Sequence, residues 1–386
     1  MTVMRPHSYS GRRSTATLSG GFSLIELLVG ILVSMICVLA IMSAFAVYEG
    51  RKRTTTSVND AEQNGSFSLF ELEREVRSAG AGIVNGSNYS LWGCPINATT
   101  NGTVVLPNAA ASLPAPFNSL WTSTQRAMPV LAASGGASQS DAIAVLSGNA
   151  AYQAFNISVV NVPSSNSITV ANNFDIQQND YLIAPLSNGS CALTQVSTLS
   201  GTTGLILSTT NSSTANLPTA QYIFDLGAQP TYTLYGVNAT NNTLVSYDLL
   251  QRTTNGGNTT TPIASGIVAM KVLYGIHDGS TSGMPDNYID KWVQPTGTWD
   301  ISALSASTSA AANAINEIKA VRIAVVAQSR LPESASSYTT GAATLTLFPD
   351  LTSSGLQYAV TTLPQYRYRV YDTTIPVQNA MINNHY

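Results

Sequence analysis

Residues 22–47 read FSLIELLVGILVSMICVLAIMSAFAV, a run of 26 residues that holds one charged side chain, Glu26. As a helix, this run would extend about 39 Å, enough to cross a hydrocarbon core of about 30 Å with some tilt. A secretory signal peptide has a shorter apolar region, typically about 7–15 residues, with small residues at the cleavage site that follows it. Here the small residues Gly20 and Gly21 precede the run. The sequence therefore predicts a membrane helix that stays in the mature chain.

Glu26 is an unusual residue in such a segment. An ionisable group costs about 3 kcal/mol at the centre of a membrane helix and less near its end, and it marks a functional site unless a simpler role is found. The simpler role is that of a plain signal anchor, with an acid tolerated near the membrane interface. The residues alone leave both interpretations open.

The composition of the whole chain restricts the class of function. Of the 386 residues, 44% are hydrophobic but only 10% are charged, well below the roughly 25% of an average soluble domain. Ser, Thr, Asn and Gly replace the missing charge, which suits a protein that works outside the cytoplasm or packs against partners. The formal net charge is −3, and an acidic surface repels phosphate groups, so nucleic-acid binding is not expected.

The apolar run continues into an amphipathic stretch that lacks proline as far as Pro95. Apolar or small residues recur there at spacings of three and four, as on one face of a helix: Val58, Ala61, Gly65, Leu69, Leu72 and Val76. Glu73 and Arg77 stand four residues apart and can pair on the outer face. Gly80 and Gly82 predict the end of the helix at residues 78–82.

Residues 83–386 predict a body rich in β-structure, because short alternating or apolar runs recur between turn residues. The expected strands are residues 141–146, 155–160, 181–184, 193–196, 205–207, 232–237, 267–274, 317–328 and 366–371. Residues 300–316, rich in Ala and Ser, predict a short helix. Loops are expected at residues 97–118, 134–140, 209–219 and 253–262. The fold class is α+β, with the second half of a long N-terminal helix packed on this body, as one sheet or two.

The string Gly21-Phe22-Ser-Leu-Ile-Glu26-Leu-Leu resembles the class III leader junction of type IV prepilins and of type II secretion pseudopilins. The resemblance implies that a prepilin peptidase cuts after Gly21 and methylates the new amino terminus at Phe22. Glu26 then stands at the fifth mature position, where its implied partner is the terminal amine of a neighbouring subunit, and this pair sets the register of the filament.

The same resemblance implies a domain organisation and a location. Residues 1–21 are the leader peptide, 22–48 the transmembrane and assembly helix, 49–82 its amphipathic continuation, and 83–386 the body. The junction motif, not the basic residues on either side of the span, sets the orientation. The chain is expected in a bacterial inner membrane with its body in the periplasm, and after assembly in an extracellular pilus.

Further blocks resemble the PilW family of minor pilins: residues 71–80, 180–184 with 191–196, 267–275 and 366–379, where Gln378 replaces a common Arg. The resemblance implies a minor pilin that primes a type IV pilus filament and lies near its tip. Its implied partners are other minor pilins, the major pilin, the inner-membrane assembly platform and a PilC/PilY-type tip adhesin. A J-like pseudopilin of type II secretion, and a tip adhesin or DNA-uptake pilin, are the alternatives.

Three cysteines are present. Cys37 lies in the apolar run, and Cys94 and Cys191 lie in the body. No CxxC string and no Cys/His cluster occurs in the sequence, so zinc and redox motifs are not supported. In an exported protein, Cys94 and Cys191 predict one disulfide; two separate buried thiols are the alternative.

Residues for catalysis or metal binding are few. No HExxH, GxSxG or P-loop string occurs in the sequence, so neither an enzyme nor a cofactor is expected. One loop, with Asp278, Asp286 and Asp290, begins like a calcium loop, with oxygen-bearing residues at every second position and glycine sixth. Its twelfth residue, Ile289, lacks the required carboxylate and Pro285 intrudes, which favours a solvated turn.

Overall fold

The computed structural model describes residues 21, 23–107, 113–121, 124–150, 156–251, 259–283, 285, 287–306, 308–333 and 343–381. The chain divides into two units, residues 1–53 and residues 54–386. Most of the predicted leader, residues 1–20, and Phe22 lie outside the described residues. The predicted cleavage and methylation of the Gly21–Phe22 junction therefore stay predictions.

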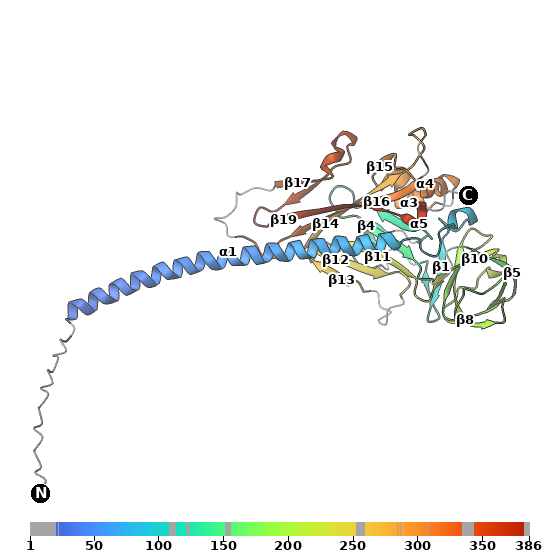
Figure 1. The fold of residues 1–386 in the computed structure, drawn as a ribbon, viewed down its shortest axis with the longest axis horizontal. Coiled ribbons are helices and arrows are strands. Elements are labelled where there is room, and N and C mark those ends of the chain that lie inside the picture. The colour runs from blue at the N-terminus through green and yellow to red at the C-terminus, as the bar shows by residue number, and fades with distance from the viewer. Residues whose placement is uncertain are drawn as a thin grey trace, which may run out of the picture. The chain divides into compact units, whose positions relative to one another are not determined.

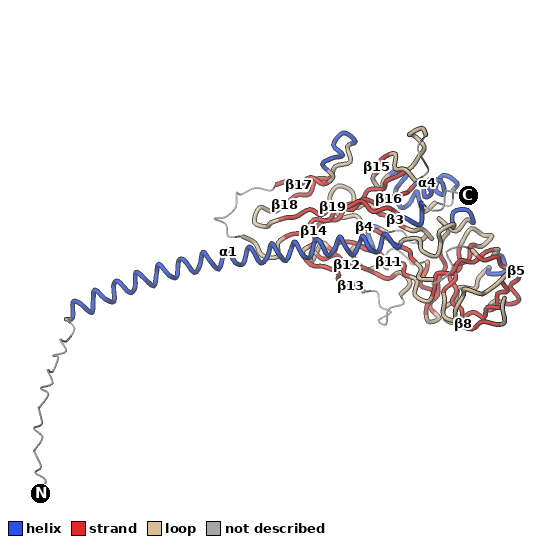
Figure 2. Tube along the Cα trace, viewed as in Figure 1, coloured by secondary structure: helices blue, strands red, loops and turns tan. Residues whose placement is uncertain are grey.

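A single helix, α1 (Leu24–Ser78), begins in the first unit and ends in the second. Its first 30 residues carry the apolar run, and every described side chain up to Arg53 is exposed. Among the described residues, α1 is the helix that is long and apolar enough to cross a membrane. Figures 1 and 2 show this helix and the β-rich body that follows it, so the predicted α+β class is confirmed.

The part of α1 in the second unit buries one face. Its buried residues are Ser57, Ala61, Gly65, Ser68, Leu72 and Val76, while the predicted members Val58 and Leu69 are half-buried. Ser68 can be buried because its hydroxyl donates to the Asn64 carbonyl at 2.6 Å, and the Ser57 hydroxyl accepts a bond from the Leu331 amide at 2.9 Å. The helix ends as predicted at Ser78 and is followed by Gly80, which has a positive φ of 79°.

Two sheets form the part of the body beside this helix. A five-stranded sheet has the order β13-β12-β11-β4-β3, with β3 (Val130–Ala133), β4 (Ala142–Ser147), β11 (Thr231–Asn238), β12 (Thr243–Asp248) and β13 (Thr261–Ser265). A four-stranded sheet has the order β15-β14-β16-β19, with β14 (Ile267–Ile276), β15 (Lys291–Val293), β16 (Ile318–Gln328) and β19 (Tyr368–Pro376). A separate hairpin pairs β17 (Ala343–Leu347) with β18 (Tyr358–Thr362).

The third sheet closes into a small barrel. It has eight strands in the order β2-β1-β8-β7-β10-β5-β6-β9, and β8 also pairs with β9, so that strands β5 to β10 form a ring. The strands are β1 (Ile96–Thr100), β2 (Thr103–Leu106), β5 (Ile157–Ser164), β6 (Ser167–Val170), β7 (Tyr181–Pro185), β8 (Cys191–Ser200), β9 (Gly204–Leu207) and β10 (Tyr222–Gly227). The ring has its own apolar core, which includes Ile168, Leu182, Val196 and Leu205.

The barrel is an insertion into a hairpin of the five-stranded sheet. Strands β4 and β11 are antiparallel neighbours, with Ser147 opposite Thr231, and the chain between them builds the whole ring from β5 to β10. The body therefore contains more than the one or two sheets left open by the sequence.

The described residues contain more short helices than the single one that the sequence predicts. They are η1 (Gly86–Tyr89), α2 (Phe117–Leu120), η3 (Leu217–Thr219), η4 (Gly297–Trp299), α3 (Ile301–Leu304), α4 (Ser309–Glu317), η6 (Pro349–Ser354) and α5 (Gln378–Met381). The single helix predicted at residues 300–316 is two, α3 and α4. Each has its own capping side chain: Asp300 accepts a bond from the Ser302 amide at 2.8 Å, and Thr308 accepts one from the Ala311 amide at 3.2 Å.

The loop expected at residues 97–118 is a further error, because β1, β2 and α2 lie there. Strand β1 reads INATT and has few apolar side chains, so it carries no alternating pattern, and its pairing with β2 and β8 decides its structure. The expected strands fall within or overlap β4, β5, β7, β8, β9, β11, β14, β16 and β19.

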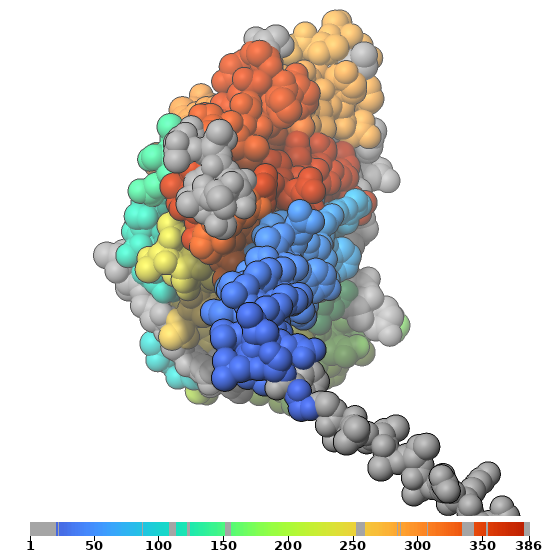
Figure 3. Space-filling view, turned by 90° about the vertical axis from the view of Figure 1, so that its left-hand side faces the viewer, coloured from blue at the N-terminus to red at the C-terminus, as the bar shows by residue number. Residues whose placement is uncertain are grey.

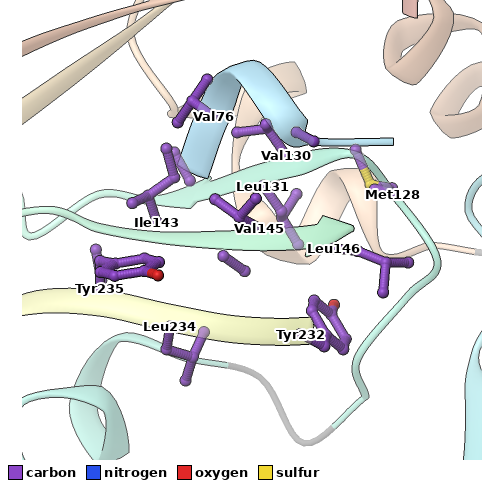
Figure 4. Packing of buried hydrophobic residues seen from close by; sticks show 14 of the residues in the cluster. Val76, Met128, Val130, Leu131, Ile143, Val145, Leu146, Tyr232, Leu234 and Tyr235 are labelled. Atoms are coloured by element: carbon purple, nitrogen blue, oxygen red, sulfur yellow. The ribbon is translucent and has the colours of Figure 1, made fainter. Parts of the chain in front are cut away.

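The main core lies between the end of α1 and the five-stranded sheet. Figure 4 shows Val76 of α1 above Val130 and Leu131 of β3, with Ile143 and Val145 of β4 close by. These side chains are at most 2% exposed. In Figure 3 the C-terminal strand (red) lies beside the lighter blue part of α1, in keeping with the bond that the Tyr371 hydroxyl donates to the Glu62 carbonyl at 3.1 Å.

Candidate assembly surface

The apolar part of α1 is exposed at every described residue. Its large apolar side chains are all at least half exposed, from 51% at Val38 to 79% at Leu24. A continuous apolar surface of this kind is not stable in water and requires lipid or another protein to cover it. This segment fits a membrane anchor, and it is the first part of the candidate assembly surface.

Glu26 lies in the first turn of α1 and is exposed. An acidic side chain at this end of a helix interacts favourably with the unpaired backbone N–H groups. The turn is started by Ser23, whose hydroxyl accepts a bond from the Ile25 amide at 3.3 Å. No heavy atom of the described structure lies within 4 Å of a Cβ placed on Gly21. The carboxylate and the expected cleavage point are thus both accessible, and their assigned roles stay predictions.

The outward face of α1 in the second unit also carries apolar side chains. Phe67 is 49% exposed and Phe70 is 61% exposed, on the side opposite the buried Leu72. Beyond them the face becomes charged: Arg74 pairs with Glu71 and Glu75, and Arg77 pairs with Glu73 at 2.6 Å, as the spacing predicted. The two phenylalanines form an exposed apolar patch on this half of the helix, and we include them in the candidate assembly surface.

The opposite face of α1 is held tightly to the four-stranded sheet. A Cβ placed on Gly65 would lie 2.2 and 2.6 Å from ring carbons of Tyr371 and 3.0 Å from the Cβ of Ala327. Only glycine lets the helix approach β16 and β19 this closely. At its C-terminal end, α1 is fixed by the side-chain amide of Asn379, which donates a hydrogen bond to the backbone carbonyl of Ala79 at 2.8 Å. The outward face of this half is therefore presented by a rigid support.

The structure joins Cys94 and Cys191 in a disulfide, with a Cα–Cα distance of 5.7 Å. The bond connects the segment that follows α1 to β8 of the barrel, and beside it the Cys191 amide donates to the Pro95 carbonyl at 2.8 Å. Cys37 is a free and exposed thiol in the apolar part of α1.

The loop weighed as a calcium site is closed by its own acids. One carboxylate oxygen of Asp290 accepts bonds from the amides of Asp278 and Gly279, both at 3.0 Å, and lies 3.0 Å from Nδ1 of His277. Asp278 pairs with Lys291, and this ammonium holds the pKa of the Asp278 carboxyl below its usual range. Asp286 lies outside the described residues. Within the part of the chain that the structure describes, no group of three or more His, Cys, Asp or Glu residues could hold a metal ion.

Sequence reasoning missed a buried ion pair between two sheets. Nζ of Lys271 in β14 lies 3.0 Å from Asp141, which precedes β4, and also donates to the carbonyls of Gly136 and Gln139, both at 2.6 Å. The second oxygen of Asp141 accepts a bond from the Val272 amide at 2.9 Å. Burial raises the pKa of Asp141, and the charge of Lys271 opposes that shift. A lone lysine in an apolar strand was the only signal, and nothing in the sequence indicated its partner.

A second buried acid lies where the barrel meets the rest of the body. Asp225 of β10 is 1% exposed, and one of its oxygens accepts a bond from the Gly227 amide at 2.8 Å. Its other oxygen has no hydrogen-bond partner in the described structure. Burial, with the charges of Asp180 and Asp175 nearby, raises the pKa of Asp225 to about 7. This carboxyl can therefore change its charge near neutral pH.

Comparison with known proteins finds one family model that matches part of the chain. Residues 231–379 match the family model of the type IV pilus-assembly protein W, PilW. Over these residues the chain is similar to the PilW family of type IV pilus-assembly proteins. The match begins at β11 and ends in α5, so it covers the strands that follow the barrel and leaves α1 and the barrel outside. The predicted PilW resemblance is confirmed, and pilins are structural proteins.

One solved structure, the type IV-like pilin TTHA1219 from Thermus thermophilus, is similar at 14% sequence identity with a TM-score of 0.23. The similarity covers 53% of this chain and 86% of that chain. The search of curated proteins finds no match to this chain.

Proposed function

We propose that this chain is a minor pilin of the PilW type, which primes the assembly of a type IV pilus filament and stays near its tip. The observation that carries the proposal is the size of the body. The described part of residues 83–386 forms three sheets and a separate two-stranded hairpin, and strands β5 to β10 of one sheet close into a barrel inserted between β4 and β11. Subunits stack closely along a fibre, so a head of this size would crowd its neighbours in the shaft. At a tip it has open space on one side.

The assembly surface suggests how the subunit would join a filament. A prepilin peptidase would cut after Gly21 and methylate Phe22, which leaves a cationic amine beside an exposed acid, Glu26. When the subunit leaves the membrane, the apolar part of α1 would pack against the helices of other pilins. Contacts with protein would then replace its contacts with lipid. Phe67 and Phe70 would continue this contact beside the body. Pairing of Glu26 with a neighbour's terminal amine would offset its desolvation and set the axial register.

The body would then make the contacts that distinguish a tip subunit from a shaft subunit. Before assembly it would lie in the periplasm, with the chain anchored by α1 in the inner membrane and in contact with the assembly platform. In the filament it would meet other minor pilins, the first major pilins and a PilC/PilY-type adhesin. The apolar helix supports the membrane anchor, and the match to PilW supports the pilus.

Deletion of the gene tests this role. We expect the major pilin to remain in the membrane while surface pili fall sharply, because a filament without its initiator forms slowly. Reintroduced wild-type gene should restore the pili. A deletion strain with normal pili would contradict the proposal. If that strain instead fails to export substrates of type II secretion, the chain is a pseudopilin.

A further inference from the structure

A polar groove runs along the body beside α1. It holds a cleft of about 610 Å³ between the helix, the turn from β11 to β12 and the end of β16. A second cleft, of about 720 Å³, shares Asn242, Gln328 and Tyr366 with the first. The two clefts are therefore parts of one groove. All of its lining residues belong to the second unit of the chain.

Amide side chains dominate the lining of the first cleft. Gln63 and Asn64 come from α1, Asn241 and Asn242 from the turn, and Gln328 from β16. An amide offers both a donor and an acceptor at fixed positions, and these match the neighbouring hydroxyls of a sugar ring. We propose that this groove binds a neutral oligosaccharide. The inference goes beyond the role in filament assembly and does not depend on it.

Much of the hydrogen-bonding capacity of the groove is unused. Within the described residues, the side chains of Gln63 and Asn241 and the hydroxyl of Tyr366 form no hydrogen bond. Two other amides make only long bonds: Asn64 donates to the Ser265 hydroxyl at 3.4 Å, and Asn242 donates to Gln328 at 3.5 Å. Such groups are held by water in the free protein and can exchange it for sugar hydroxyls.

The second cleft adds the apolar surface that a sugar also needs. Tyr366 and Tyr368 are half-buried, and the side chains of Val360 and Leu363 lie in the same lining. One face of a pyranose ring carries only C–H groups, and these bury favourably against an aromatic or aliphatic surface. A cavity of this size is within the range of about 300–1,000 Å³ typical of small-ligand sites. It would hold a short oligosaccharide.

The charges of the groove favour a neutral ligand. Asp60 and Arg330 are the charged residues that line the first cleft, and they have opposite signs. Lys271 lines the second cleft, but it is only 3% exposed and its ammonium is bound to Asp141. An acidic polysaccharide would find no cluster of cations here. A polar loop of a neighbouring pilin is the competing occupant, and the experiment separates it from a sugar.

The test uses the full mature chain in detergent micelles, with cellobiose, lactose and N,N′-diacetylchitobiose as neutral probes and digalacturonic acid as the acidic control. Saturation-transfer NMR should detect at least one neutral probe, and titration should give its Kd. We expect Tyr366→Ala and Asn241→Ala each to weaken that Kd at least tenfold. The matched variants Tyr288→Ala and Asn172→Ala, at exposed positions outside the groove, should leave it unchanged.

Thermal unfolding of each variant shows whether it is folded. If Tyr366→Ala is unstable, Asn241→Ala, at an exposed turn position, tests sugar binding by the groove on its own. The inference would be overturned if none of the neutral probes showed saturation transfer. It would also be overturned if all variants bound the sugar with the same Kd as the wild type. Groove variants that reduce pilus number without any sugar binding would overturn it as well, because the groove would then hold a pilin. The same titration with polysaccharide from the producing cells, and with glycans from a foreign cell surface, identifies which of the two supplies the sugar.

Discussion

The two halves of α1 form one continuous helix but behave in opposite ways. From Leu24 to Arg53, no described side chain is buried. From Ser57 to Val76, one face is buried against sheets of the same chain, and a glycine, Gly65, allows close contact. The first half therefore owes its stability to an environment outside the chain, and the second half to the body.

This difference separates two kinds of change. A substitution in the first half should alter membrane or filament contacts and leave the folding of the body intact. A substitution in the body should alter its free energy of unfolding and leave the membrane anchor intact. Four sets of substitutions test this separation.

Glu26→Ala should have the largest effect, a loss of most surface pili in a strain that depends on this chain. The variant removes the exposed carboxylate that would pair with a neighbour's terminal amine. Electron microscopy of surface pili measures the effect. Leader processing, membrane retention and the melting temperature of the body should match the wild type.

Glu49→Ala is the matched control, because Glu49 is another exposed acid in the same half of α1. It should assemble normally. Pili at wild-type number in the Glu26→Ala strain would remove the assigned role of this residue.

Loss of the disulfide should give the largest change in body stability. The bond closes a loop with a sequence separation of 97 residues, which corresponds to about 4–5 kcal/mol in the chain-entropy model. Cys94→Ala with Cys191→Ala should lower the free energy of unfolding by up to this amount in denaturant titration. Cys37→Ala should leave it unchanged. Peptide mapping without reductant should find Cys94 linked to Cys191; alkylation of both thiols in the native protein would reject the bond.

Because of Asp225, we expect the free energy of unfolding of the body to depend on pH. The folded pKa of Asp225, about 7, lies above the ordinary value of 3.8, so the folded state binds the proton more tightly than the unfolded state. The stabilisation is complete below about pH 4, is lost as the pH rises to about 7, and does not change further above that. The free energy of unfolding should fall by about 2–4 kcal/mol across this range.

Asp225→Asn should remove that slope, since an amide does not titrate. Asp60→Asn, at an exposed position on α1, should keep it. Denaturant titrations at intervals between pH 4 and pH 8 measure both variants. An unchanged slope in Asp225→Asn would show that another group is responsible.

Gly65→Ala should have the smallest effect, a destabilisation of about 1–3 kcal/mol, typical of overpacking. The added methyl group overlaps the ring of Tyr371, which has to move away from α1. Gly50→Ala is the control in the exposed half of the helix, where a Cβ meets nothing within 4 Å. It should leave the body unchanged. Equal melting temperatures for Gly65→Ala and the wild type would mean that the close packing of α1 has no energetic role.

Structural features that depend on a local pattern could be predicted from the sequence. The apolar run predicted the membrane helix, and spacings of three and four predicted the burial of Ala61, Gly65, Leu72 and Val76. Ser57 and Ser68 escaped prediction because their hydroxyls are satisfied by specific backbone partners, which hydrophobicity does not encode. Alternation located strands such as β4, β11 and β16, since each buries its own apolar side chains.

Features that depend on distant partners could not be predicted. The barrel closes through pairings such as β8 with β9 and β10 with β5, and no single strand carries a signal of that closure. The same holds for the pair of Asp141 and Lys271, which lie 130 residues apart. The first cleft of the groove is likewise built from α1 and four other segments, at residues 241–242, 265–266, 328–330 and 366, so its amides come together only in the folded body.

Quantitative mass spectrometry of sheared pili measures how many copies of this chain a filament contains. We expect its peptides at a small fraction of the major pilin, because a head of this size fits the tip and not the shaft. We also expect the first mature peptide to begin with methylated Phe22. An abundance comparable to that of the major pilin would show that the chain is a shaft subunit and not a tip subunit.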